Sequence, residues 1–122
     1  MKPGNPETFA MKDRRCAPCE GGTPPMDDRQ IADYLPHTPG WKPMDHDTAI
    51  ERTFKLSDFH EALAFVNAVA WIAHREDHHP IIELNYRQIR LRYTTHAIGG
   101  LSENDFICAA KVNALLDSPT AG

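Results

Sequence analysis

An alternation of apolar and polar side chains fills residues 81–93, which read Ile81-Ile82-Glu83-Leu84-Asn85-Tyr86-Arg87-Gln88-Ile89-Arg90-Leu91-Arg92-Tyr93. Side chains two residues apart lie on the same face of a β-strand. The pattern therefore predicts two strands joined by a turn near Arg87, with an apolar face made of Ile82, Leu84, Tyr86, Ile89, Leu91 and Tyr93. Because the opposite face is polar, we expect an antiparallel sheet that is covered on one side.

A second pair of strands is predicted earlier in the chain, over residues 41–44 and 49–56. The turn-forming residues Asp45-His46-Asp47 separate the two stretches. We therefore expect a second hairpin.

A long helix is predicted between the two hairpins. Ser57 is typical of an N-cap, and Asp58 and Glu61 follow in the first turn. The apolar stripe at helical spacing contains Phe59, Leu63, Val66, Ala70 and Ala73, and is widened by Phe65, Val69 and Ile72. The residue before a proline avoids the helical region, so the helix should end near Asp77, just before His79 and Pro80.

Two shorter helices complete the predicted elements. The first covers residues 27–34, where acidic residues begin the helix and Pro36 ends it. The second covers residues 103–116 and follows Ser102, whose spacing to Asp105 resembles a capping box. The element order α-β-β-α-β-β-α predicts an α+β fold, a four-stranded antiparallel sheet with three helices packed on one face.

The length of the chain, 122 residues, leaves room for one hydrophobic core. Residues 1–26 are rich in Pro, Gly and charged residues and lack a sustained period. We therefore expect a flexible N-terminal extension over residues 1–26 and one domain over residues 27–118.

The composition argues against several classes of protein. A net charge of −4 spread over both signs provides no basic face for nucleic acid or an anionic membrane. No apolar run approaches the roughly 20 residues that cross a bilayer, and no apolar signal segment follows Met1. Three cysteines are too few for a secreted disulfide framework. We expect a cytoplasmic protein without a nucleic-acid or membrane partner.

Three of the seven histidines are predicted to converge. His78 and His79 lie between the long helix and the strand that follows it, and His96 lies after the returning strand. Because the two strands of this hairpin have similar lengths, His96 returns to the end where the histidine pair lies. Imidazole titrates near neutral pH, so such a cluster can hold one ring as a base and another as an acid.

The spacing of these residues resembles the signature of the pterin-4a-carbinolamine dehydratase family. The resemblance covers about residues 27–116 and rests on Asp77-His78-His79-Pro80, Tyr86, Thr94-Thr95-His96, Gly100-Leu101-Ser102-Glu103 and Asp105. It implies a hydro-lyase that dehydrates a 4a-hydroxytetrahydropterin to quinonoid dihydropterin in tetrahydrobiopterin recycling. It implies no metal and no cofactor.

The resemblance also implies roles for individual residues. The implied catalytic residues are His78, His79 and His96, with His78 and His96 transferring protons and His79 mainly holding the pterin. The residues implied to border the pterin with them are Asp77, Thr94 and Thr95.

Two further residues are expected to support the catalytic rings, His74 and Asp105. His74 stands where family members commonly carry a glutamate, which suggests a role in orienting an active-site ring. Glu76 is a nearby carboxylate that offers a substitute.

Two alternatives involve metal or redox chemistry. His74 and His78 have the i, i+4 spacing that suits zinc, but a helix that ends before His78 disturbs this geometry. Cys16-Ala17-Pro18-Cys19 is a CxxC motif, but structural zinc needs a second such pair. Pro18 and the following glycines disfavour the helix that a redox motif uses, so we predict no catalytic role for this pair.

A third alternative is a non-catalytic dimerisation or assembly factor of the same fold, since the family includes such members. The retained histidines favour an enzyme, because function resides in sites. The resemblance further implies a homodimer or homotetramer, whose contacts would cover an edge strand.

Overall fold

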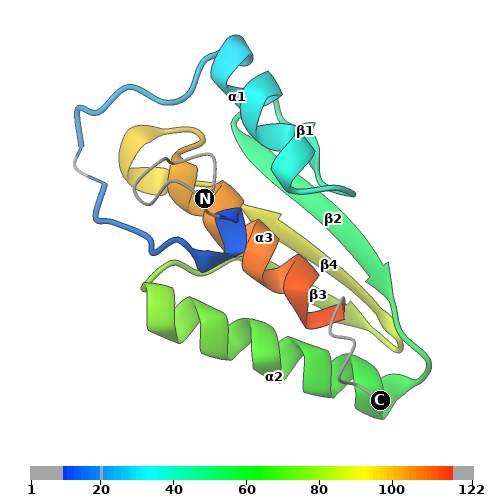
Figure 1. The fold of residues 1–122 in the computed structure, drawn as a ribbon. Helices are drawn as coiled ribbons and strands as arrows, with labels where there is room; N and C mark the ends of the chain where they lie inside the picture. The colour runs from blue at the N-terminus through cyan, green and yellow to red at the C-terminus, as the bar shows by residue number, and fades with distance from the viewer. Residues whose placement is uncertain (1–9, 20, 117–122) are drawn as a thin grey trace.

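The structure is a computed structural model, and it describes residues 10–19 and 21–116. Its principal elements are α1 (Asp28–Tyr34), β1 (Lys42–Met44), β2 (Ala49–Lys55), α2 (Phe59–Glu76), β3 (Ile81–Asn85), β4 (Gln88–Tyr93) and α3 (Glu103–Leu116). Among the described residues, short 3-10 helices also occur at η2 (Met11–Asp13), η3 (Leu35–His37) and η4 (His96–Ile98). The predicted order α-β-β-α-β-β-α is confirmed (Figure 1).

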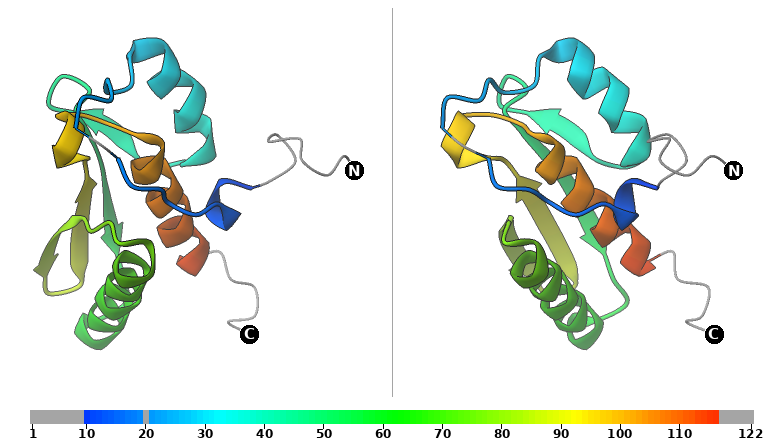
Figure 2. Two further views of the ribbon diagram at one scale, coloured as in Figure 1. Left: turned by 90° about the vertical axis from the view of Figure 1, so that its left-hand side faces the viewer. Right: turned by 60° about the vertical axis from the view of Figure 1, so that its left-hand side comes forward.

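The four strands form one antiparallel sheet in the order β1-β2-β4-β3. In the predicted hairpin of residues 81–93, Ile82 pairs with Leu91 and Leu84 with Ile89. The long helices α2 and α3 lie on one face of the sheet, with α1 near the β1 end (Figures 1 and 2). The α+β fold with its helices on one face is therefore confirmed.

The core lies between the sheet and these helices. Ile89, Leu91 and Tyr93 of β4 have no exposed surface, and they pack with Val69 of α2 and Phe106 of α3. Burial of this apolar layer stabilises the fold, at about 25 cal/mol per Å² of apolar surface removed from water. None of the described helices has the length and apolarity of a bilayer-spanning segment.

The buried stripe of α2 agrees with the predicted one at Phe65, Val69 and Ala73 and differs elsewhere. The side chains that face the core are Ala62, Phe65, Val69, Ala73 and Glu76, whereas Phe59, Leu63 and Ala70 are exposed. Apolar residues cover more than half of the helix surface, so periodicity alone could not show which line of side chains meets the sheet.

Three local details also differ from the sequence interpretation. Asp58 rather than Ser57 is the N-cap of α2, because its carboxylate accepts the Glu61 N–H at 2.8 Å. Tyr86 leaves the apolar strand face and occupies the β3–β4 turn at a φ of 56°, with 65% of its surface exposed. The Asp105 carboxylate accepts the Ser102 N–H at 2.9 Å as in a capping box, but the Ser102 hydroxyl lies 2.8 Å from that of Thr95.

The N-terminal segment of residues 10–19 and 21–26 contacts the domain at several points. Met11 is buried against Ile107 and Ala110 of α3, and the Met26 N–H donates to the Leu101 carbonyl at 2.9 Å. These contacts show where the segment lies. The flexibility of the extension and the domain bounds stay predictions, and residues 1–9, 20 and 117–118 lie outside the described residues.

Candidate active site

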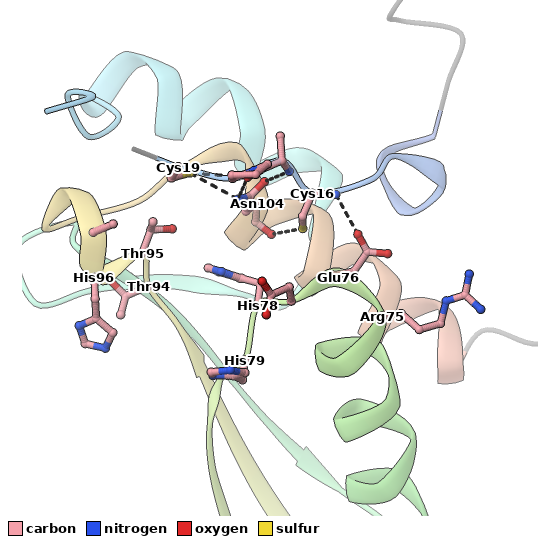
Figure 3. A pocket seen from close by; sticks show the side chains of 14 residues that line it. Cys16, Cys19, Arg75, Glu76, His78, His79, Thr94, Thr95, His96 and Asn104 are labelled. Carbon is pink, nitrogen blue, oxygen red and sulfur yellow. Dashed lines mark hydrogen bonds between the residues drawn. The ribbon is translucent and has the colours of Figure 1, made fainter. Parts of the chain in front are cut away.

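A pocket of about 530 Å³ opens where the end of α2, the end of β4 and the N-terminal segment meet (Figure 3). The side chains around it come from segments far apart in the chain: Cys16, Ala17, Pro18, Cys19, Arg75, Glu76, Asp77, His78, His79, Thr94, Thr95, His96, Ala97 and Asn104. The structure thus places all three predicted histidines on one pocket, together with Asp77, Thr94 and Thr95.

Asp77 directs the histidine pair toward the pocket. It caps α2 in the left-handed conformation, with φ 52° and ψ 44°, which aspartate tolerates better than most residues. The His78 N–H still donates to the Ala73 carbonyl at 3.2 Å, which holds the exit of the helix. The chain then enters β3, so His78 and His79 lie at the junction of helix and strand.

His78 is the best-fixed ring of the three. Its Nε2 lies 2.6 Å from Oδ1 of Asp105, whose side chain has no exposed surface. The second oxygen of Asp105 accepts from the Thr95 hydroxyl at 2.8 Å and from the Ser102 N–H at 2.9 Å. On one face, the His78 ring stacks on Tyr93 with the centroids 5.8 Å apart and the planes 8° from parallel.

This arrangement selects a tautomer of His78. An ionised carboxylate only accepts hydrogen bonds, so Nε2 carries the hydrogen that points at Asp105. In the neutral ring, Nδ1 then carries a lone pair and is a hydrogen-bond acceptor. The pair has the form in which a carboxylate orients a catalytic imidazole.

His79 and His96 are more exposed than His78. His96 begins η4, a short turn closed by the Thr95 N–H, which donates to the Gly100 carbonyl at 2.9 Å. Thr94 anchors the end of β4, because its hydroxyl donates to the Thr48 carbonyl at 2.6 Å. His79 and His96 therefore come from two different segments that border the same space (Figure 3).

Asn104 and the N-terminal segment form a wall of the pocket that the sequence analysis did not identify. The Ala17 N–H donates to Oδ1 of Asn104 at 3.0 Å, and Nδ2 of Asn104 donates to the Ala17 carbonyl at 2.6 Å. The partners are 87 residues apart, and no local pattern signals such a contact. Asn104 thus ties this wall to α3.

Glu76 holds the same wall from the side of α2. Its carboxylate accepts the Cys16 N–H at 2.8 Å and lies 3.1 Å from the Arg15 side chain and 3.7 Å from Lys111. Burial acts to raise the pKa of Glu76, but the Cys16 N–H, Lys111 and Arg15 together hold this pKa below its ordinary value. The carboxylate is therefore kept charged beside the pocket.

His74 does not line the pocket. It lies on the exposed side of α2 with its ring 5.3 Å from that of Trp71, so its predicted orienting role has no contact to support it. Glu76, the carboxylate considered as its substitute, does border the site. Within residues 10–19 and 21–116, no group of three or more His, Cys, Asp or Glu side chains is arranged to hold a metal ion.

Comparison with known proteins gives one consistent result. The sequence model of the family described as pterin 4 alpha carbinolamine dehydratase matches residues 24–115. Two similar proteins are each named "Putative pterin-4-alpha-carbinolamine dehydratase". The one from Nitrosomonas eutropha is 53% identical to this chain, and the match covers 88% of this chain and 95% of that protein. The one from Xanthomonas campestris is 50% identical, and the match covers 91% of this chain and 94% of that protein. A crystal structure titled as a transcriptional coactivator/pterin dehydratase from Brucella melitensis superposes with a TM-score of 0.72 and 32% identity, covering 75% of this chain and 97% of that one.

Proposed function

Because the chain belongs to the pterin 4 alpha carbinolamine dehydratase family, we propose that it removes water from a 4a-hydroxytetrahydropterin and releases quinonoid dihydropterin. The observation that carries the proposal is the His78–Asp105 pair, 2.6 Å apart on a pocket that also carries His79 and His96. A pocket of about 530 Å³ lies within the usual range for small-molecule sites. The physiological setting that we propose is tetrahydrobiopterin recycling.

The reaction needs both an acid and a base. The 4a-hydroxyl leaves as water only after it gains a proton, while an electron pair from the ring nitrogen next to C4a forms the new C=N bond. A base then removes the proton from that nitrogen. Each proton transfer by a positioned side chain is worth about 10²–10⁴ in rate.

We assign the base to His78. Its Nε2–H is directed to Asp105, so Nδ1 has the free lone pair that a base requires. As the ring takes up a proton, the buried carboxylate stabilises the imidazolium that forms.

We assign the acid to His96, which lies across the group of lining residues from the end of α2 (Figure 3). It is exposed and lies on a turn, so it can exchange protons with solvent between turnovers. His79 is left to hold the pterin, with Asp77, Thr94 and Thr95 bordering it.

The test follows the decay of freshly generated 4a-hydroxytetrahydropterin by ultraviolet absorbance. We expect His78→Ala and His96→Ala each to lower kcat by about 100-fold or more. His79→Ala should mainly raise KM. His60→Ala is the matched control, because His60 lies exposed in the first turn of α2 and does not line the pocket. A wild-type rate equal to the spontaneous rate would refute the proposal.

The chain also offers surface for self-association, and one observation supports this. Large apolar side chains are exposed on the outer side of α2, among them Leu63 at 40% and Trp71 at 59%. Ile81, at the start of the edge strand β3, is 50% exposed. We propose that a second copy of the chain covers such surface in a homodimer or homotetramer. Sedimentation of wild type and Trp71→Lys tests this, and an unchanged monomer in both would contradict it.

A further inference from the structure

Two cysteines from opposite ends of the chain meet behind the pocket. The sulfur atoms of Cys16 and Cys108 are 3.6 Å apart, although 92 positions separate the two residues. Cys16 is half-buried on the pocket wall, whereas Cys108 is fully buried on α3. The Cys108 sulfur also lies 4.0 Å from the His78 carbonyl oxygen. The thiol pair therefore adjoins the backbone of the best-fixed histidine.

The CxxC motif points to a different pairing, because it places Cys19 closest to Cys16 in sequence. In the structure, Cys19 instead accepts a hydrogen bond from Nδ2 of Asn104, at 3.4 Å from its sulfur. The contact between Cys16 and Cys108 is thus the one that tertiary structure creates.

We propose that Cys16 and Cys108 form an oxidative modification site, at which hydrogen peroxide converts the two thiols into a disulfide that links the N-terminal wall of the pocket to α3. This site goes beyond the dehydration reaction. Its formation needs only the two thiols and the oxidant.

The two cysteines have different parts in the chemistry. Cys16 is half-buried and Cys108 is buried, so the Cys16 sulfur is the one that attacks the peroxide. The O–O bond breaks, and a sulfenic acid and water form. The hydrogen bond with Cys16, followed by burial, raises the pKa of Cys108 well above the ordinary value of a thiol. Cys108 therefore reacts second. Its sulfur attacks the sulfenic sulfur, the S–O bond breaks, and the hydroxide leaves as water with the Cys108 proton. In sum, two thiols and one peroxide yield one disulfide and two waters, and a dithiol reverses the change by exchange.

The disulfide would displace the pocket wall. A sulfur–sulfur bond is about 2.05 Å long, so the two atoms must approach by about 1.5 Å from their present 3.6 Å. Cys16 carries Ala17, Pro18 and Cys19 with it, and all four line the pocket. A displacement of about 1 Å in a positioning wall is enough to change how a substrate is held.

The test treats the reduced full-length protein with a small excess of hydrogen peroxide and maps the cysteines by mass spectrometry without reductant. We expect a loss of two hydrogen masses, a cross-linked peptide that joins Cys16 to Cys108, and reversal by dithiothreitol. Cys16→Ser and Cys108→Ser should abolish the cross-link. Cys19→Ser is the matched control and should retain it.

Two further measurements connect the disulfide to stability and substrate binding. Closing so long a loop should raise the thermal midpoint by roughly 5 °C or more, and only in proteins that keep both thiols. The KM for the carbinolamine should change by about twofold or more in oxidised wild type but not in peroxide-treated Cys108→Ser.

A cross-link between Cys16 and Cys19, or irreversible oxidation of Cys16 without a cross-link, would overturn the proposal. An unchanged KM would overturn its effect on the pocket wall. If the protein shows no dehydration at all, the proposed function fails, while the mass and thermal measurements still decide on the disulfide.

Discussion

Replacing Asp105 by asparagine tests the inferred tautomer of His78 with almost no change in side-chain volume. In the wild type, one carboxylate oxygen faces Nε2 of His78 and the other receives hydrogens from Thr95 and Ser102. The asparagine oxygen should occupy the position that accepts hydrogen bonds from the Thr95 hydroxyl and the Ser102 N–H. Its NH₂ group then faces His78, so Nε2 must accept and the ring hydrogen moves to Nδ1. The nitrogen that serves as base would thereby lose its lone pair.

The structure sets the size of the two expected effects. The variant loses one charge-assisted hydrogen bond in a fully buried place, which should lower the free energy of unfolding by about 1–3 kcal/mol. The loss of a positioned base should lower kcat by about 10²–10⁴. KM should change little, because the groups that border the pterin stay in place.

Three measurements check this prediction. The absorbance assay gives kcat and KM, thermal unfolding shows that the variant is folded, and nitrogen NMR of the His78 ring reports which nitrogen carries the hydrogen. Asp33→Asn is the control, because Asp33 is an exposed residue of α1. The reasoning is refuted if Asp105→Asn keeps kcat within about threefold of wild type, or if it loses activity while the ring hydrogen stays on Nε2.

Three other predictions concern stability. The Tyr93 hydroxyl is buried and has no hydrogen-bond partner among the described residues, so Tyr93→Phe should raise the free energy of unfolding in urea by about 1 kcal/mol; destabilisation would show that the hydroxyl is bonded. Leu91→Ala should lower the free energy of unfolding by about 2–5 kcal/mol, because Leu91 is fully buried. Ile81 is half exposed, so Ile81→Ala should lower it by less than about 1 kcal/mol. Equal losses in the two variants would contradict the described core. The pKa of Glu76 is lower in the folded protein than in the unfolded chain, so its charge stabilises the fold at pH values above the unfolded pKa. This stabilisation is lost as the pH falls through the folded pKa. Glu76→Gln should therefore be less stable than wild type at pH 7, with a difference that shrinks in acid unfolding curves; a constant difference would count against this charge effect.

Local patterns account for most of the fold. The period of two over residues 81–93 predicted β3 and β4, because alternation is a property of a single strand and needs no knowledge of its partners. Pro80 likewise placed the end of α2 within a residue or two of Glu76. The alternation gave a wrong position for Tyr86. Tyr86 continues the apolar pattern of the first strand, but it lies in the two-residue turn between β3 and β4.

Part of the candidate site was also accessible from the sequence. His78, His79 and His96 could be brought together because a hairpin of known length connects them. The carboxylate that fixes His78 was expected only as a supporting residue, and its distance and full burial come from the packing of α3 against β4.

The sequence by itself determined the order of helices and strands and the end of the sheet at which the histidines gather, because these follow from spacing between near neighbours. Only the tertiary structure decided which side of α2 is buried, that Glu76 rather than His74 borders the pocket, and that Cys16 lies beside Cys108. Those contacts join residues that are up to 92 positions apart. Their geometry depends on how the helices settle on the sheet, and periodicity within one segment carries no information about that packing.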